Sequence, residues 1–306
     1  MKKNLPKVSI IIATYNSGPY IQETLNSIYK QTGLGEQFNI ELIVVDDCST
    51  DDTQQILKSN DLIFFATNEN SGGPNRGRNI GLKEATGQHI CIVDHDDQWL
   101  QGKLLAQLEV CHLALIISSG FSVVNKTTGD SLNHQNKTKD PYIVYDRGVT
   151  FFNKMLKQKK GQNTYLGSIM FSSELKHILF EEHFGMVDFD WLLRMFDGQK
   201  LVEVNQCLYN RIVFGSNLSL NEAYRIKDFY YTLLTLEDYW DRYPQHCLLS
   251  YKRSHGSLAR YYYLMGNMKR ARFYFLKSEL TAKTILYYIT TFAGHSYVKK
   301  KFNVFG

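Results

Sequence analysis

The stretch Val8-Ser-Ile-Ile-Ile-Ala-Thr-Tyr-Asn16 is dominated by β-branched apolar residues, which predicts a short buried strand. Similar apolar runs recur along the first 125 residues, and segments with apolar residues at helical spacing separate them. The expected strands are residues 8–15, 41–46, 62–66, 89–94 and 113–124, and the expected helices follow Pro19, a cap at Ser49 or Thr50, Arg78 and Leu100. This alternation is typical of an α/β fold with a mainly parallel central sheet covered on both faces.

Polar segments stand at the carboxyl ends of these strands, where the ligands of parallel sheets bind. The sharpest is Val93-Asp-His-Asp-Asp97, which places three mutually repelling carboxylates within four residues. Hard oxygen ligands favour magnesium or manganese, whereas an acidic turn in solvent is the simpler alternative. An EF-hand loop is excluded, because Trp99 and Leu105 stand where that motif needs glycine and glutamate.

Two further polar segments follow strands. Val45-Asp-Asp-Cys-Ser49 could accept hydrogen bonds from a base or a ribose, or could cap the next helix. In residues 68–79, Gly72 permits close approach of the backbone to a ligand. Arg76 and Arg78 lie in the same segment and are the only arginines in the first 140 residues, which indicates recognition of an anion or a base, or a local salt bridge. Neither GxxxxGK[ST] nor GxGxxG occurs, so a P-loop and a dinucleotide fingerprint are excluded.

A fourth segment, Gly185-Met-Val-Asp-Phe-Asp-Trp-Leu-Leu-Arg194, predicts a helix that begins near Asp188. The carboxylate would then lie at the positive end of the helix dipole. A capped amphipathic helix without a catalytic role is the alternative interpretation.

The formal net charge of +5 hides two different regions. Residues 1–110 carry 9 Lys and Arg against 14 Asp and Glu, whereas residues 245–306 carry 11 Lys and Arg against one acid, Glu279. The second region is rich in tyrosine and phenylalanine and is helical in pattern from about residue 222. Cations among aromatic rings suit a membrane interface with anionic lipids, while a helical cap with its aromatic residues packed inward is the alternative. No nucleic-acid-binding module is recognised.

The sequence also indicates the cellular compartment and the number of domains. No run reaches the ~18 apolar residues of a membrane-spanning helix, and the N-terminus lacks the cleavage site of a signal peptide. Five scattered cysteines without a CxxC pair predict neither a disulfide framework nor a zinc site. We therefore expect a cytoplasmic protein with one domain over residues 1–220 and a helical extension over residues 221–306.

Taken in order, these segments resemble the family 2 glycosyltransferases, which have the GT-A fold. The matching segments are Val8–Asn16, Glu41–Asp51, Asn70–Gly81, Asp94–Asp97 with Trp99, Val187–Arg194, and Asn210-Arg211 with Ser216 and Ser219. Three positions depart from the family pattern. Ala13 replaces a proline, Gly77 replaces an alanine, and Val187 replaces the glutamate before Asp188, with Asp190 as a nearby alternative base.

The resemblance implies a role for each matching residue. Donor binding would fall to Thr14, Tyr15, Asp46, Asp47, Gly72, Arg78, Asp94 and His95; Mn²⁺ or Mg²⁺ would be held by Asp94, Asp96 and Asp97; and Asp188 would be the catalytic base. The implied enzyme is an inverting, metal-dependent glycosyltransferase of hexosyltransferase type that uses a nucleotide-diphosphate sugar. Its acceptor would be a hydroxyl of a glycan or lipid-linked glycan in bacterial cell-surface polysaccharide synthesis. We expect it at the inner face of the plasma membrane, in contact with the membrane surface through its basic tail.

Two alternatives have different sequence requirements. A sugar-phosphate nucleotidyltransferase would carry a basic, glycine-rich loop after the first strand, and Ala13–Pro19 contains no basic residue. A non-catalytic module that only binds nucleotide sugars is suggested by Val187. No motif after residue 125 identifies the acceptor.

Overall fold

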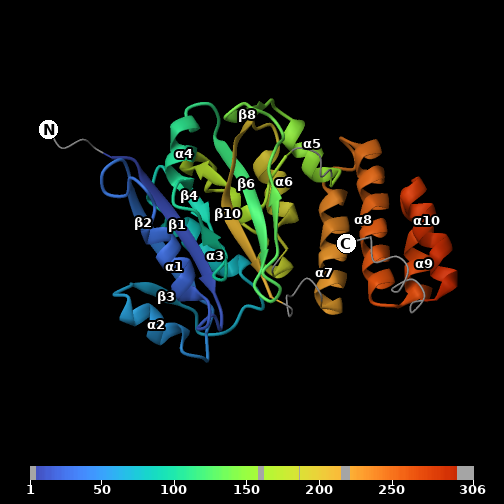
Figure 1. Cartoon of the computed structure of the whole chain (residues 1–306), viewed down its shortest axis with the longest axis horizontal. Coiled ribbons are helices and arrows are strands. Elements are labelled where there is room, and N and C mark those ends of the chain that lie inside the picture. Colours follow the sequence, from blue (N-terminus) through green and yellow to red (C-terminus); the bar gives the residue numbers. More distant parts are fainter. Residues whose placement is uncertain (1–4, 158–161, 186, 215–220, 295–306) are drawn as a thin grey trace. The chain divides into compact units, whose positions relative to one another are not determined.

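The computed structural model describes residues 5–157, 162–185, 187–214 and 221–294 (Figure 1). The chain divides into two compact units, residues 1–154 with 159–217 and residues 155–158 with 218–306. The predicted domain boundary at residue 220 falls outside the described residues, as do Ser216 and Ser219 of the closing motif, and it stays a prediction.

The first unit alternates strands and helices around one mixed sheet. Its strands are β1 (Lys7–Thr14), β2 (Asn39–Asp46), β3 (Phe64–Ala66), β4 (His89–Ile92), β5 (Gln98–Trp99), β6 (Ile116–Asn125), β7 (Ser131–His134), β8 (Tyr142–Tyr145), β9 (Met170–Ser172) and β10 (Leu201–Val213). Its helices are α1 (Ile21–Tyr29), α2 (Thr53–Ser59), α3 (Asn75–Glu84), α4 (Lys103–Val110), α5 (Val149–Met155) and α6 (Phe189–Phe196), with short 3-10 turns η1 (Leu166–Ser168), η2 (Ser173–Leu175) and η3 (Glu182–Phe184).

The sheet runs in the order β3-β2-β1-β4-β9-β6-β10-β5, with β7 on β6 and β8 on β10. Strands β3, β2, β1 and β4 are mutually parallel, and β6 is parallel to β10. The short β9 is antiparallel to both β4 and β6 and joins the two parallel groups. The parallel register brings the ends of β1, β2 and β4 to one edge, so the polar segments after Thr14, Asp46 and Ile92 converge there.

The expected α/β class with a mainly parallel central sheet is confirmed, and so are the five expected strands, within a few residues. Two expectations were wrong. The polar sequence of residues 125–145 predicts an exposed loop, but these residues contain β7 and β8, which cover the edges of β6 and β10. The helix expected after a cap at Ser49 or Thr50 begins at Thr53, because Ser49 instead donates to the Asp46 carboxylate.

Helix α3 packs tightly on β1 and β2. Gly81 faces Ile11, and a Cβ added at Gly81 would lie 2.4 Å from the Ile11 side chain. One turn earlier, a Cβ added at Gly77 would lie 3.0 Å from the Cβ of Ala13. The two positions at which the sequence departs from the family pattern, Ala13 and Gly77, therefore face each other, and together they let the start of α3 approach the end of β1.

The second unit is helical in its described part, with helices α7 (Glu222–Glu237), α8 (Pro244–Leu264), α9 (Met268–Leu276) and α10 (Ala282–Thr290) and the turn η5 (Thr291–Ala293). Its core consists of residues such as Phe229, Ala259, Tyr263 and Phe275, with Ala271 closing the α8–α9 hairpin. Across the described residues, no helix combines the length and the apolar character that crossing a bilayer would need.

One buried carboxylate in the first unit has no cationic partner among the described residues. Glu203 of β10 is 0% exposed and accepts hydrogen bonds from the side chains of Asn136 and Asn163 and from the backbone N–H of Asn163. Burial raises the pKa of Glu203 from 4.5 to about 7, although these hydrogen bonds oppose the shift. The folded protein therefore holds this proton more tightly than the unfolded chain does.

This proton makes the stability of the first unit depend on pH. The stabilisation that it provides is present below pH 4.5 and is lost as the pH rises to about 7. Over that window the free energy of unfolding of the wild type should fall by about 1–3 kcal/mol relative to Glu203→Gln. Urea unfolding at several pH values measures this difference, and substitution of the exposed Glu36 by glutamine should follow the wild type. Parallel curves for wild type and Glu203→Gln would contradict the assignment.

Candidate functional site

The acidic turn after β4 is held by an ion pair from α3. Arg78 Nη2 lies 2.8 Å from Asp94 Oδ1, and only 5% of the arginine side chain is exposed. The guanidinium also lies 5.2 Å from the centre of the Phe180 ring and donates to Asn75 Oδ1 at 3.2 Å. The turn itself is closed by a bond from the Asp97 N–H to the Asp94 carbonyl and is tied to α1 through Thr24. Arg78 and Asp94, each predicted as a donor-site residue, are thus brought together, and the local salt bridge given as an alternative for Arg78 is present.

The same helix holds the loop that precedes α6. Asn75 Nδ2 donates to the carbonyls of Glu181 (3.0 Å) and Val187 (3.2 Å), and the Asn75 backbone N–H donates to the Gly185 carbonyl (3.1 Å). The backbones meet directly, because a Cβ added at Gly73 would lie 2.4 Å from the carbonyl carbon of Gly185. Residues 73–75 and 181–187 therefore form one packed contact, although over 100 positions separate them.

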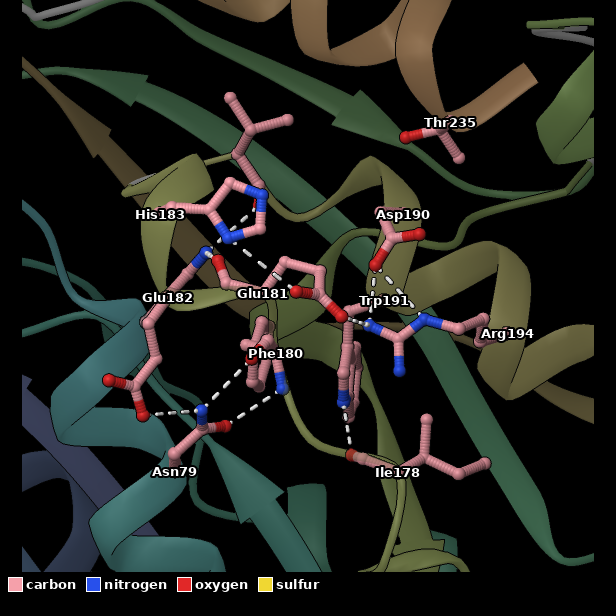
Figure 2. A network of polar contacts seen from close by, with 12 residues as sticks. Asn79, Ile178, Phe180, Glu181, Glu182, His183, Asp190, Trp191, Arg194 and Thr235 are labelled. Atoms are coloured by element: carbon pink, nitrogen blue, oxygen red, sulfur yellow. Dashed lines mark hydrogen bonds and ion pairs between the residues drawn. The ribbon is translucent and has the colours of Figure 1, made fainter. Parts of the chain in front are cut away.

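Figure 2 shows how this contact continues along α3. Asn79 Nδ2 donates to the Phe180 carbonyl and to Glu182 Oε1, while Asn79 Oδ1 accepts from the Phe180 N–H. Phe180 stacks on Trp191 of α6, with ring centres 4.4 Å apart, and Trp191 donates to the Ile178 carbonyl. Asn75, Arg78 and Asn79 lie three and four positions apart, so one face of α3 carries the whole connection.

Asp188 stands at the start of α6 as predicted. It occupies the N-cap position, where the helix dipole favours a negative charge, and it is half-buried. Its carboxylate makes no hydrogen bond to the described residues, and its charge contributes to raising the pKa of the buried Tyr165. The neighbouring Val187 is buried, 3% exposed, and its side chain offers no carboxylate where the family pattern has a glutamate.

Asp190 does not fit the role of an alternative base. Its carboxylate is buried and forms an ion pair with Arg194, one helical turn later. Arg194 also reaches Glu181 at 3.9 Å. The guanidinium occupies the Asp190 carboxylate, which favours Asp188 as the group available to a substrate.

Asp97 does not fit the predicted role of a metal ligand. It is 2% exposed, and its two carboxylate oxygens accept bonds from the Ile212 N–H (2.7 Å) and from the Tyr209 hydroxyl. Burial, and then the charges of Asp94 and Asp96, raise the pKa of Asp97 well above its usual range. Asp97 thus joins the acidic turn to β10, and we leave it out of the proposed ligand set.

Asp94 and Asp96, both half-buried, remain as the candidate metal ligands of the turn. Burial, opposed by His95 and reinforced by Asp94, raises the pKa of Asp96. Arg211 of β10 lies close enough to lower the pKa of Asp96, and its guanidinium stacks over Tyr165 at 5.2 Å. A cation from β10 thus stands beside the acidic turn.

The carboxylate ligands of this turn suit a magnesium or manganese ion whose remaining ligands come from a substrate. Over the residues that the structure describes, no three His, Cys, Asp or Glu side chains converge to hold a metal ion alone. Magnesium, however, is commonly bound by one or two carboxylates together with substrate phosphates. The two carboxylates of Asp94 and Asp96 fit that pattern.

Comparison with known proteins gives the family. The model of "Glycosyl transferase family 2" matches residues 9–194, which include the acidic turn, α3 and α6 as far as Arg194. This chain belongs to glycosyltransferase family 2. The predicted relationship is therefore confirmed.

Individual relatives agree with this assignment. The poly(ribitol-phosphate) beta-N-acetylglucosaminyltransferase TarS of Staphylococcus aureus is 46% identical over 95 residues, which are 30% of this chain but 16% of that relative. The putative teichuronic acid biosynthesis glycosyltransferase TuaG of Bacillus subtilis is 27% identical over 264 residues, 81% of this chain and 96% of the relative. The crystal structure of S. aureus TarS 1–349 in complex with UDP-GlcNAc superposes with a TM-score of 0.61 at 20% identity, covering 98% of this chain and 94% of that one. The expected GT-A fold is thereby confirmed.

Asp46 and Asp47, which were also predicted to bind the donor, accept hydrogen bonds that hold the loops of this family 2 chain in place. The Asp46 carboxylate is fully buried and accepts from Ser49 and Gln54. The Asp47 carboxylate accepts from Thr67 and from both the N–H and the hydroxyl of Ser71. The chain's own donors therefore engage both carboxylates, and contact of either with a base stays a prediction.

Of the four other predicted donor-site residues, Thr14 ends β1, and Tyr15, Gly72 and His95 lie in the segments that follow β1, β3 and β4. Thr14 is buried and hydrogen-bonded to Ser17, whereas Tyr15 is 43% exposed. Gly72 has a φ of +78°, which favours glycine, and His95 Nδ1 lies 3.4 Å from the Ala13 carbonyl. Their roles in donor binding also stay predictions.

Sequence reasoning missed the residues that connect the motifs. The missed residues are Asn75, Asn79, Tyr165 and Tyr209. The contact of Arg211 with the acidic turn was missed as well. A helix start at Asn75 rather than Arg78 would have placed Asn75, Arg78 and Asn79 on one face. For Tyr165 and Tyr209 no local pattern was available, because their partners are distant in the sequence.

The approach of Gly73 to Gly185 gives a direct test of this site. Gly73→Ala should destabilise the protein by about 1–3 kcal/mol and reduce turnover, because the new methyl group collides with backbone. Chemical unfolding and transferase assays measure both effects. Gly102→Ala is the matched control, since its methyl group would enter open space. Equal stabilities of the two variants would contradict the contact.

Proposed function

We propose that this family 2 chain is an inverting, metal-dependent glycosyltransferase that transfers a sugar from a nucleotide-diphosphate sugar to a hydroxyl of a glycan or lipid-linked glycan. The proposal covers bacterial cell-surface polysaccharide synthesis. It is supported by relatives named for poly(ribitol-phosphate) and teichuronic acid glycosyltransferases. A neighbouring structure in complex with UDP-GlcNAc favours a UDP-sugar as donor.

One observation carries the proposal. Asn75 accepts a hydrogen bond from Arg78, the partner of Asp94, and donates one to the carbonyl of Val187, the residue before Asp188. A single side chain thus links the acidic turn to the candidate base. An inverting transferase needs the phosphate-binding turn and the base held in a fixed relative position, because the donor phosphates and the attacking hydroxyl must meet the sugar from opposite sides.

The donor half would use the acidic turn and its neighbours. Asp94 and Asp96 would hold Mn²⁺ or Mg²⁺, and Arg211, whose charge acts on Asp96, would bind a phosphate oxygen directly. When bound, the metal neutralises the charge that develops on the leaving diphosphate, so no proton donor to that group is needed. Arg78 keeps Asp94 oriented through a bond that the protein buries.

The acceptor half would use Asp188. Its carboxylate is free of hydrogen bonds to the described residues and can accept the proton of the attacking hydroxyl. One base with no second carboxylate fits a single displacement, which inverts the configuration at the sugar. The buried Val187 is consistent with Asp188 acting alone.

Donor and metal binding can be tested without turnover. Thermal shift with common UDP- and GDP-sugars should show stabilisation by one donor, because a ligand that binds the folded state stabilises it by mass action. Manganese should enlarge the shift, and Asp96→Asn should remove the enlargement. Asp130→Asn, on an exposed loop, is the matched control. A full manganese effect in Asp96→Asn would contradict the ligand assignment.

The base assignment has its own test. Asp188→Asn should lower kcat by roughly 10²–10⁴-fold, because the hydroxyl would lose its proton acceptor. Donor binding in the thermal-shift assay should persist. Full activity of this variant would contradict the base assignment. A wild type that binds a donor but neither transfers nor hydrolyses the sugar would instead identify a non-catalytic binding module.

We also propose that the enzyme works at the inner face of the plasma membrane, in keeping with a lipid-linked acceptor. The excess of basic residues over one acid in residues 245–306 supports this location.

A further inference from the structure

The second unit leaves an unusual number of large apolar side chains uncovered near its C-terminal end. The exposed ones between α9 and η5 are Phe273, Leu276, Leu280, Ile285, Leu286, Ile289 and Phe292. The aromatic residues that the sequence suggested for a membrane contact divide into two groups. Tyr262, Tyr263, Phe275 and Tyr287 are buried in the core of the unit, whereas Phe273 and Phe292 face outward.

The exposed residues share faces of their helices. On α10, Ile285, Leu286 and Ile289 lie on the side opposite the buried Thr284 and Tyr287. On α9, Leu276 lies one turn after Arg272. The Arg272 guanidinium lies 4.8 Å from the centre of the Phe292 ring and donates to the Thr291 carbonyl. Arg272 therefore connects the apolar face of α9 to that of η5.

Basic side chains border this surface. The Lys277 ammonium lies 4.5 Å from the centre of the exposed Phe273 ring, and Arg272 lies against the exposed Phe292. Over the described chain, neither Lys277 nor Arg272 pairs with an acid, and the one acid of the region, Glu279, is occupied by Arg253. Apolar and aromatic side chains rimmed by unpaired cations match a bilayer surface that carries anionic phospholipid.

We propose that the outward face of α9, α10 and η5 is the membrane-docking surface of this protein, with Leu286 and Ile289 entering the acyl boundary and Arg272 and Lys277 contacting lipid phosphates. This inference deepens the proposed membrane location and does not depend on the transfer chemistry. It assigns to described residues what the sequence assigned only to a basic tail.

Vesicle flotation of the full chain tests the surface. The protein should bind vesicles with about one third phosphatidylglycerol, should bind pure phosphatidylcholine weakly, and should be released at ~0.5 M salt. The double variant Leu286→Glu with Ile289→Glu should bind roughly tenfold less. Leu248→Glu is the matched control, because Leu248 of α8 is as exposed as Leu286, at 45%, and lies outside the surface. Arg272→Glu with Lys277→Glu should also weaken binding, by about fivefold per residue, whereas Lys252→Glu on α8 should not.

The outcomes separate this inference from the proposed function. UDP-sugar thermal shifts of each variant report on the first unit and confirm that the protein is folded. Donor binding without vesicle binding would overturn the docking surface and leave the transferase proposal intact. Vesicle binding that the double variant retains would also overturn it. A wild-type dimer that the double variant dissociates, with no vesicle binding, would assign the surface to a second copy of the chain instead.

Discussion

The buried ion pair between Arg78 and Asp94 is the contact on which the rest of the site depends. The Arg78 side chain is 5% exposed, so its charge is costly unless a carboxylate pairs with it, and breaking a buried ion pair typically costs about 3–5 kcal/mol. The pair fixes α3 against the turn after β4. Because the same helix face carries Asn75 and Asn79, it also fixes the loop before α6. One electrostatic requirement therefore sets the separation between the acidic turn and Asp188.

Most of the fold could be predicted from the sequence, because its information is local. Short β-branched runs such as Val8–Ile12 form parallel strands wherever helices separate them. The parts that were missed depend on distant pairing. Strands β7 and β8 lie in a polar segment that predicts a loop, and they form by pairing with β6 and β10. No local pattern in residues 131–134 or 142–145 encodes such partners.

The site could be predicted as a set of motifs but not as a connected structure. Asp94, Arg78 and Asp188 occupy the expected positions, since strand ends and helix starts are locally encoded. Asp97 shows where this reasoning fails. In sequence it is one more carboxylate of an acidic turn, and only the fold reveals Tyr209 and Ile212 as its partners. Likewise, only the formation of α6 brings Arg194 into the ion pair that occupies the Asp190 carboxylate.

The contact between Gly73 and Gly185 has a consequence for redesign. Because two backbones meet there, no side chain can be added at position 73 without moving the backbone at Gly185, three residues before Asp188. Glu181 and His183 face solvent on the same loop. Redesign of this loop should therefore begin at such exposed side chains and leave Gly73 unchanged, together with Asn75 and Asn79, which hold the loop.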